Sequence, residues 1–236
     1  MIRFFFLNMF IGLHSIIFCL WGLLIYLLFH DEKKMHFLAA VPWAKIILKV
    51  SCIGVDIKGI ENVDPSLPRI YMTNHQSTFD IYALLAYLPV DFKFMLKQEL
   101  MKIPLLGISM RKVGYIGIDR YDPRSAVRSM QIAAEKLKKG SSVLIFPEGT
   151  RSRDGRLKSF KKGGFKLALK TGCDIVPIAI KGSYKINPKG SLRIEKGSFK
   201  MKICRPISVN EYGRGEIGVL MDRVRQEMKA FIEREE

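Results

Sequence analysis

A histidine and an aspartate lie close together where one apolar run of the chain gives way to another. In the segment YMTNHQSTFD, His75 follows the first run and Asp80 begins the second. If the first run is a strand and Ser77 caps a helix, the His75 ring can fold back from the connecting loop toward Asp80. A carboxylate bonded to one ring nitrogen fixes the tautomer and raises the basicity of the other nitrogen. Such a histidine can remove a proton from an alcohol.

The same segment also has a purely structural explanation. Ser77 and Asp80 form an S-x-x-D capping pattern, in which an acidic side chain stabilises the first turn of a helix. A histidine in the preceding loop can be incidental. Taken alone, the segment therefore leaves catalysis and helix capping both open.

A strongly basic segment follows a later apolar run, SVLIF. It reads FPEGTRSRDGRLKSFKKGG, where Pro147 ends the run and Gly149 permits a tight turn beside Glu148. Between positions 151 and 170 its one acid is Asp154, and its basic residues are Arg151, Arg153, Arg156, Lys158, Lys161, Lys162, Lys166 and Lys170. Guanidinium and ammonium groups both suit phosphate oxygens. The segment predicts a pocket for a phosphorylated substrate or, alternatively, a basic loop that rests on anionic lipid.

Short runs typical of strands alternate with segments of helical spacing through this part of the chain. We expect strands at 69–73, 92–97, 115–119, 142–146, 174–180, 191–197 and 199–207, and helices at 77–88, 98–113, 123–140, 163–172 and from 218 onward. Such alternation predicts an α/β fold with a largely parallel central sheet flanked by helices. Ligands of such sheets bind beyond the carboxyl ends of the strands. His75, Glu148 and Arg120, each at or just after the end of a predicted strand, should therefore share one edge.

An uncharged apolar segment precedes this body. No Asp, Glu, Lys or Arg occurs between Phe4 and Phe29. A helix of about 20 apolar residues crosses the hydrocarbon core of a bilayer. A cleaved signal peptide would have a shorter apolar region, of ~7–15 residues, before a small-residue cleavage site. The segment ends instead in FHDEKK, which favours retention in the membrane.

A second apolar stretch, at 37–55, carries Pro42, Trp43 and lysines, a composition typical of a helix that lies in the membrane interface. The sequence thus predicts a membrane-embedded helical segment at 1–54 and an α/β domain at 55–236. Whether the first helix spans the bilayer or the two helices dip into one leaflet stays open. More Lys and Arg follow the first helix than precede it, which predicts that the domain lies on the cytoplasmic face.

The composition narrows the possible partners. The chain has 39 Lys and Arg against 22 Asp and Glu, a net charge of +17. Such an excess favours a polyanionic partner or an anionic lipid surface. Nucleic acid is disfavoured as a partner, because no recognised binding module accompanies the charge and the first thirty residues are apolar. The four cysteines are scattered without a C-x-x-C pair, so no zinc or other metal site is predicted.

Taken together, these segments resemble the glycerolipid acyltransferase family, in particular the lysophosphatidic acid (1-acylglycerol-3-phosphate) acyltransferases. NHQSTFD matches the family's N-H-x-x-x-x-D block, and FPEGTRS matches the third block. The 97–120 segment looks like the second block. VPIAI, at 176–180, is similar to the fourth, although Ile180 stands where the family often has a proline. The resemblance covers residues 55–205.

The resemblance implies transfer of a fatty acyl group to the free sn-2 hydroxyl of lysophosphatidic acid, which gives phosphatidic acid in phospholipid biosynthesis. The donor would be acyl-CoA or acyl carrier protein, a co-substrate, and no cofactor is implied. His75, oriented by Asp80, would act as general base on the hydroxyl, whose oxygen would attack the thioester directly. The lack of an evident Ser or Cys nucleophile set up beside a base agrees with such a direct attack. The implied lipid partners, including membrane phospholipids, explain the apolar N-terminus.

The resemblance also assigns the acceptor-binding residues, because the family's second and third blocks hold the glycerol phosphate. The expected set is Asn74, Lys97, Arg120, Glu148, Gly149, Thr150, Arg151 and Lys161. Within it, Glu148 is expected to orient an arginine or bond a glycerol hydroxyl, since its charge would repel phosphate.

Two alternatives stay open. The acceptor can be glycerol 3-phosphate or another lysophospholipid, because the same base would serve each of them. The chain can also be a non-catalytic basic protein that binds membranes. In either enzymatic case we expect the catalytic domain on the cytoplasmic face of a membrane, with the bacterial inner membrane as the expected location.

Overall fold

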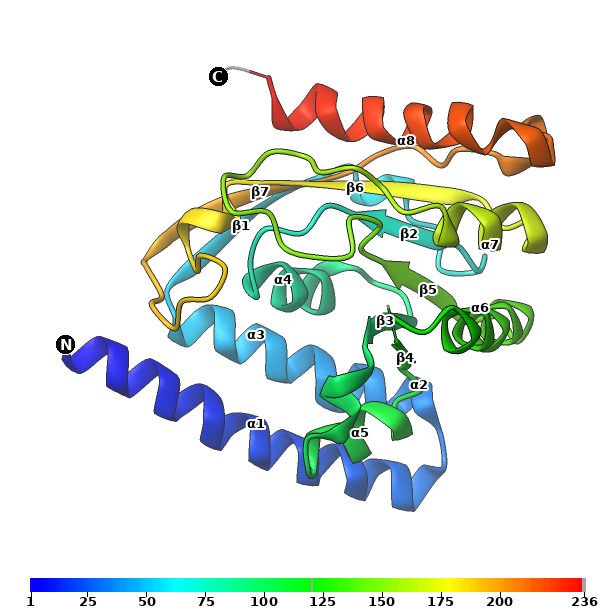
Figure 1. The fold of residues 1–236 in the computed structure, drawn as a ribbon. Coiled ribbons are helices and arrows are strands. Elements are labelled where there is room, and N and C mark those ends of the chain that lie inside the picture. The colour runs from blue at the N-terminus through cyan, green and yellow to red at the C-terminus, as the bar shows by residue number, and fades with distance from the viewer. Residues whose placement is uncertain (120, 235–236) are drawn as a thin grey trace.

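The structure, a computed structural model, describes residues 1–119 and 121–234. The helices are α1 (Ile2–Phe29), α2 (Glu32–Met35), α3 (Val41–Val50), α4 (Phe79–Tyr87), α5 (Leu106–Lys112), α6 (Pro123–Lys138), α7 (Gly163–Thr171) and α8 (Ile217–Ile232). The strands are β1 (Ile53–Lys58), β2 (Ile70–Thr73), β3 (Phe92–Lys97), β4 (Ile116–Ile118), β5 (Ser142–Ile145), β6 (Ile175–Lys181) and β7 (Gly197–Ile203). Figure 1 shows how they are arranged.

The strands form one seven-stranded sheet in the order β1-β7-β6-β2-β5-β3-β4. The run from β6 to β4 is parallel throughout, and β7 is antiparallel to β6 while it pairs in parallel with β1. The predicted α/β fold with a largely parallel sheet is therefore confirmed.

Helices cover both faces of this sheet. In Figure 1, α4 and α3 lie on one face with α1 outside them, while α6, α7 and α8 flank the other side. The central strands β2 and β5 are buried along their whole length, and β6 is buried up to its last residue. This double coverage explains why these strands read as continuous apolar runs rather than as alternating patterns.

The N-terminal helices pack on the α/β domain. Ala44, Ile47 and Leu48 of α3 are buried in the same core cluster as Tyr71 and Phe79. Helix α3 ends at Val50, and β1 occupies part of the stretch that was expected to be interfacial helix. The division into units 1–54 and 55–236 stays a prediction.

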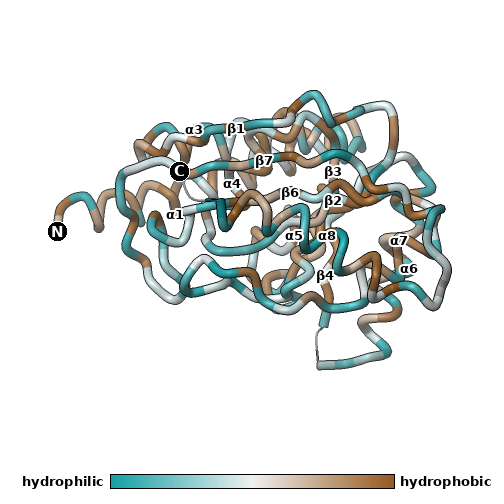
Figure 2. Tube along the Cα trace, turned by 90° about the horizontal axis from the view of Figure 1, so that it is seen from above, coloured by the Kyte–Doolittle hydropathy of each residue, from teal (hydrophilic) through white to brown (hydrophobic). Residues whose placement is uncertain are grey.

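Among the described residues, α1 alone is long and apolar enough to cross a membrane. Its inner face packs against the 36–40 segment and α5, while most of its large apolar side chains, such as Phe5, Ile17 and Leu28, are exposed. Its N-terminal end projects beyond the rest of the chain in both views (Figures 1 and 2). An exposed apolar surface of this extent marks an interaction with a membrane or another apolar partner.

Both ends of α1 are fastened to the rest of the protein. At the start, the Arg3 guanidinium donates to the carbonyl oxygens of Ile194 and Ser51. Just after the end, the Glu32 carboxylate pairs with the ammonium groups of Lys93 and Lys136. The helix is therefore held to the domain near both of its ends.

Candidate active site

The residues predicted to do chemistry follow strand ends at one edge of the sheet. The loop with His75 follows β2, Lys97 ends β3, and the segment with Glu148 follows β5. Because these strands are parallel, their carboxyl ends meet at the same edge. Arg120, predicted at the same edge after β4, lies outside the described residues.

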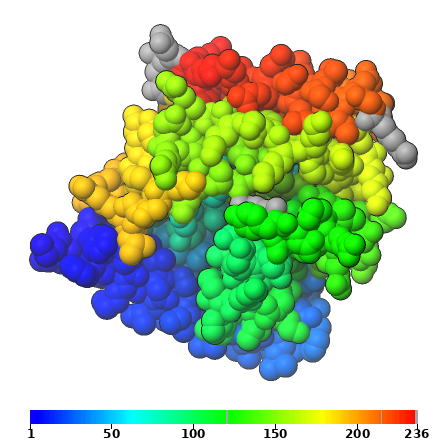
Figure 3. Space-filling model, in the orientation of Figure 1, coloured from blue at the N-terminus to red at the C-terminus, as the bar shows by residue number. Residues whose placement is uncertain are grey.

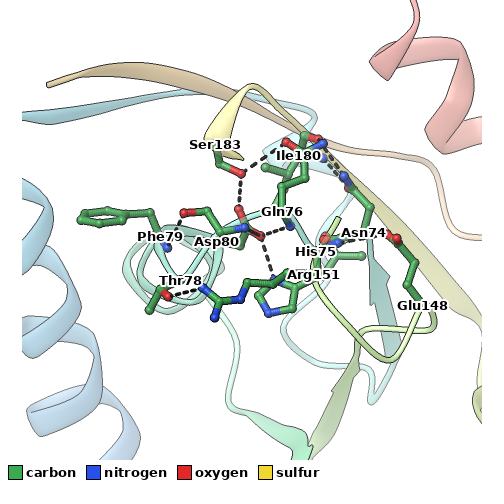
Figure 4. A network of polar contacts seen from close by, with 12 residues as sticks. Asn74, His75, Gln76, Thr78, Phe79, Asp80, Glu148, Arg151, Ile180 and Ser183 are labelled. Carbon is green, nitrogen blue, oxygen red and sulfur yellow. Dashed lines mark hydrogen bonds and ion pairs between the residues drawn. The ribbon is translucent and has the colours of Figure 1, made fainter. Parts of the chain in front are cut away.

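The expected contact between the His75 ring and the Asp80 carboxylate is present. His75 Nδ1 lies 2.8 Å from Asp80 Oδ2 (Figure 4). With its proton on Nδ1, the ring donates to the carboxylate and leaves Nε2 as a hydrogen-bond acceptor. Among the described residues, none bonds Nε2. The ring also stacks on Phe146, with centroids 4.0 Å apart. The stacking restricts the tilt of the imidazole plane, and the bond to Asp80 restricts its rotation within that plane.

Asp80 is fully buried and surrounded by donors. Its Oδ2 accepts the backbone N–H of Gln76 at 2.7 Å and of Ser77 at 2.8 Å, and its Oδ1 accepts the Ser183 hydroxyl. The bond from Ser77, together with the N–H of Phe79 donated to Ser77 Oγ, follows the predicted S-x-x-D pattern, although α4 itself begins after Thr78, whose side chain makes no capping bond. The carboxylate thus fixes the backbone just before α4 and contacts His75 as well.

The third sequence block clamps the backbone of His75. The N–H of His75 donates to Glu148 Oε1 at 3.1 Å, and the N–H of Ser152 donates to the His75 carbonyl at 2.7 Å. Glu148 Oε2 accepts the N–H of Lys158 at 3.1 Å. The loops after β2 and β5 therefore hold each other in place around the histidine.

Both oxygens of Glu148 accept backbone N–H groups, and among the described residues no arginine side chain bonds them. Its expected bond to a glycerol hydroxyl stays a prediction. The side chain is 5% exposed. Burial raises the pKa of Glu148 to about 7, although the bonds from His75 and Lys158 lower it. The carboxylate still lines the cavity beside the histidine.

Asn74, predicted to bind the acceptor, instead has a structural role at the end of β2. Its amide donates to the Ile180 carbonyl at 2.8 Å, and its Oδ1 accepts the Ile180 N–H at 2.7 Å. The side chain is 1% exposed and ties the end of β2 to the end of β6. Asn74 thereby positions the loop that carries His75.

Several cations gather near His75 without carboxylate partners among the described residues. Arg151 Nη1 donates to Thr78 Oγ1 at 3.0 Å, and Lys189 Nζ donates to Thr150 Oγ1 at 2.9 Å. Lys161 lies against Gly149, whose φ of +72° and lack of a side chain suit this tight turn. Hydroxyl partners leave the positive charges uncompensated, which suits the binding of an anion.

One cavity of about 950 Å³ connects these features. Its polar walls include the predicted residues His75, Lys97, Glu148, Gly149, Thr150, Arg151 and Lys161, so the structure brings these together. Its other walls are mostly apolar and come largely from helices, with Phe18 of α1, Trp43 of α3 and Met110 of α5 among them. Lys97 also pairs with Glu99 at 3.0 Å. The cavity thus offers polar and apolar ends around one histidine.

Two residues of the site were missed by the sequence analysis. Ser183 bonds Asp80, and Lys189 lines the cavity; both follow β6. The Gly182-Ser183 pair, one residue after the predicted strand at 174–180, was a usable turn signal for Ser183. Nothing in the sequence marks Lys189 among the many lysines.

Metal ligands do not gather in the described part of the chain: residues 1–119 and 121–234 contain no group of three or more His, Cys, Asp or Glu side chains that could hold an ion. The reaction's independence of metals stays a prediction.

The family model described as Acyltransferase matches residues 54–181, which include the whole site up to the end of β6. The chain belongs to the acyltransferase family. A crystal structure of a relative, the 1-acyl-sn-glycerophosphate acyltransferase PlsC from Thermotoga maritima, superposes with a TM-score of 0.82 at 28% sequence identity. That alignment covers 98% of this chain and 97% of the relative, so the acyltransferase fold extends to the N-terminal helices.

Two curated relatives are also similar to this acyltransferase. A chloroplastic 1-acyl-sn-glycerol-3-phosphate acyltransferase of Arabidopsis thaliana is 45% identical over 178 residues, 75% of this chain and 49% of the relative. The human 1-acyl-sn-glycerol-3-phosphate acyltransferase alpha is 30% identical over 177 residues, 75% of this chain and 62% of the relative. This acyltransferase thus spans about half the length of its chloroplastic curated relatives.

Proposed function

We propose that this acyltransferase transfers a fatty acyl group from acyl-CoA or acyl carrier protein to the sn-2 hydroxyl of lysophosphatidic acid, giving phosphatidic acid. The observation that carries the proposal is the single cavity around His75. It has uncompensated cations on one side, suited to a phosphate, and apolar walls on the other, suited to an acyl chain. The names of the relatives from Arabidopsis thaliana and Thermotoga maritima support this acceptor.

In the proposed reaction His75 is the general base. Its Nε2 takes the proton of the sn-2 hydroxyl while the oxygen attacks the carbonyl carbon of the thioester. The tetrahedral intermediate collapses, the C–S bond breaks, and the leaving thiolate receives the proton from Nε2. Asp80, bonded to Nδ1, holds the tautomer and stabilises the imidazolium that forms between the two proton transfers.

The apolar walls support the choice of a lipid substrate. Helices α1, α3 and α5 all contribute to them, so the cavity opens among the helices that carry the exposed apolar surface. A hydrocarbon chain that enters there is removed from water, and the hydrophobic effect stabilises its binding by roughly 0.8 kcal/mol per buried CH₂. Acceptor and product would then reach the site from the membrane.

The test uses the full chain purified in detergent, with acyl-CoA or acyl carrier protein as donor and a panel of acceptors. Released thiol is measured. We expect release that depends on lysophosphatidic acid and is absent with an analogue whose sn-2 hydroxyl is replaced by hydrogen. Transfer to glycerol 3-phosphate or another lysophospholipid alone would overturn the acceptor assignment. No release with any pair would leave a non-catalytic membrane-binding protein.

We further infer that α1 lies in one leaflet on the cytoplasmic face, as expected for a bacterial inner membrane. The helix has 28 residues and is about 42 Å long. Because Arg3 and Glu32 fasten its two ends to the same domain, both ends belong on the same side of the bilayer. The basic excess after the helix supports the cytoplasmic side.

Cysteine labelling in a bacterial host tests this orientation. A variant without native cysteines receives one cysteine, as Ile2→Cys or Lys33→Cys, at exposed positions on either side of α1. We expect a membrane-impermeant maleimide to label both positions in inverted vesicles and neither in intact spheroplasts. Labelling of position 2 alone from the outer side would identify a spanning helix instead.

A further inference from the structure

Lys189 lies on a loop that no predicted block includes. This 187–196 loop connects the turn Ser183–Lys185 to β7. Lys189 nevertheless lines the same cavity as His75 and Arg151. Its ammonium group donates to Thr150 Oγ1 at 2.9 Å, so it touches the residue next to Arg151 in the chain.

The electrostatic surroundings of Lys189 are strongly positive. Partial loss of water and the charges of Lys158, Arg153 and Arg151 lower the pKa of Lys189. Within the part of the chain that the structure describes, no carboxylate pairs with the Lys189 ammonium group. Cations held together in this way repel one another, and a dianion placed between them removes the repulsion.

The 187–196 loop is held from two sides, which gives Lys189 a defined place. On the catalytic side, Ser77 Oγ donates to the Asn187 carbonyl at 3.1 Å. Within the loop, Asn187 Nδ2 donates to the carbonyls of Ser191 and Arg193, both at 2.9 Å. On the membrane side, Asn8 of α1 donates to the Leu192 carbonyl at 3.1 Å. In Figure 3 this yellow segment rests on the blue start of α1.

We propose that Lys189 binds the phosphate of the acceptor together with Arg151. This inference rests on the proposed function and names a further ligand of the same site. A phosphate monoester suits the pair, because an arginine offers a directional fork and a lysine a mobile point charge.

The acceptor's phosphate fits this position better than those of coenzyme A. In lysophosphatidic acid only a few bonds separate the phosphate from the sn-2 hydroxyl, so its ligands must lie near the base. Arg151 is bonded to Thr78, close to His75 in the chain, and Lys189 is bonded to the residue beside Arg151. The pantetheine arm, by contrast, separates the phosphates of coenzyme A from the thioester carbon.

The experiment compares Lys189→Ala with the wild type on two acceptors that share one acyl chain, lysophosphatidic acid and its phosphate-free monoacylglycerol. Loss of a charge-assisted bond costs roughly tenfold or more. We expect the KM for lysophosphatidic acid to rise at least about tenfold, with the KM for the acyl donor and any transfer to monoacylglycerol unchanged. Lys189→Arg should keep the KM within about threefold of the wild type.

Two further variants make the comparison specific. Lys185→Ala, on an exposed residue that does not line the cavity, should behave as the wild type. Arg151→Ala gives the reference effect for a lost phosphate ligand. A Lys189→Ala enzyme with unchanged KM for lysophosphatidic acid, or with an equal rise in donor KM, would overturn this inference while the proposed function stands. A wild type that acylates no lysophosphatidic acid would overturn both.

Discussion

The His75→Ala protein is expected to release thiol at least about a hundredfold more slowly than the wild type. A positioned general base contributes ~10²–10⁴-fold to such a reaction. Among the described residues, His75 is the group in the cavity that combines a carboxylate on one ring nitrogen with a free second nitrogen. The measurement is the initial rate of thiol release with saturating lysophosphatidic acid, confirmed by mass spectrometry of the phosphatidic acid formed.

A second variant separates lost chemistry from lost folding. The Asn side chain in His75→Asn keeps an N–H donor in the neighbourhood of Asp80 but cannot accept the proton at neutral pH. It should be as slow as the alanine variant, with a thermal unfolding midpoint close to that of the wild type. If either variant kept more than about a tenth of the wild-type rate, His75 would not be the base.

Replacement of Asp80 is expected to have the next largest effect, on activity and on stability together. Asp80→Ala strands the N–H groups of Gln76 and Ser77 in a fully buried site, at roughly 1–3 kcal/mol for each unsatisfied group. The free energy of unfolding should fall by about 3 kcal/mol. The rate should fall at least about a hundredfold as well, because the His75 ring loses its orienting partner.

Asp80→Asn and Ser183→Ala distinguish these two roles. The side-chain amide in Asp80→Asn has the same volume as the carboxylate but places an N–H group against other hydrogen-bond donors. The rate of thiol release by this variant should therefore stay low. Ser183→Ala removes one donor from Asp80 Oδ1 and leaves Oδ2 and the histidine in place. Its rate should remain within about tenfold of the wild type. Equal losses of rate in Asp80→Asn and Ser183→Ala would contradict a separate role for the His75–Asp80 contact.

Local patterns were enough to predict much of the site's framework. The strand β3 has the predicted bounds, because Asp91 precedes its largely apolar run and Gln98 after it begins a new helical turn. The contact between His75 and Asp80 depends on a strand, a short loop and a helix cap, all encoded within ten residues. Such features need no knowledge of the rest of the chain.

Features that depend on distant partners were predicted wrongly or missed. The first half of strand β1 was assigned to an apolar helix and its second half was missed, because its partner β7 lies far away in the sequence. The stretch 191–197 was predicted to be a strand, but the structure has irregular chain there until β7 begins at Gly197. Contacts with Asn8 and Arg3 hold that loop, and no local pattern announces them. The place of Lys189 follows from the same contacts.

The docking of α1 has a consequence for the order of events during synthesis. The helix leaves the ribosome long before its partners, because Arg3 bonds Ile194, 191 positions later in the chain, and Asn8 bonds Leu192, 184 positions later. Until those residues are made, the start of α1 lacks these polar contacts, and its large apolar side chains, such as Phe5, Ile17 and Leu28, are exposed even in the finished fold. If α1 lies in one leaflet, as proposed above, the membrane covers these side chains from the beginning. The nascent chain is then anchored before its sheet can close, and its folding is completed at the membrane surface.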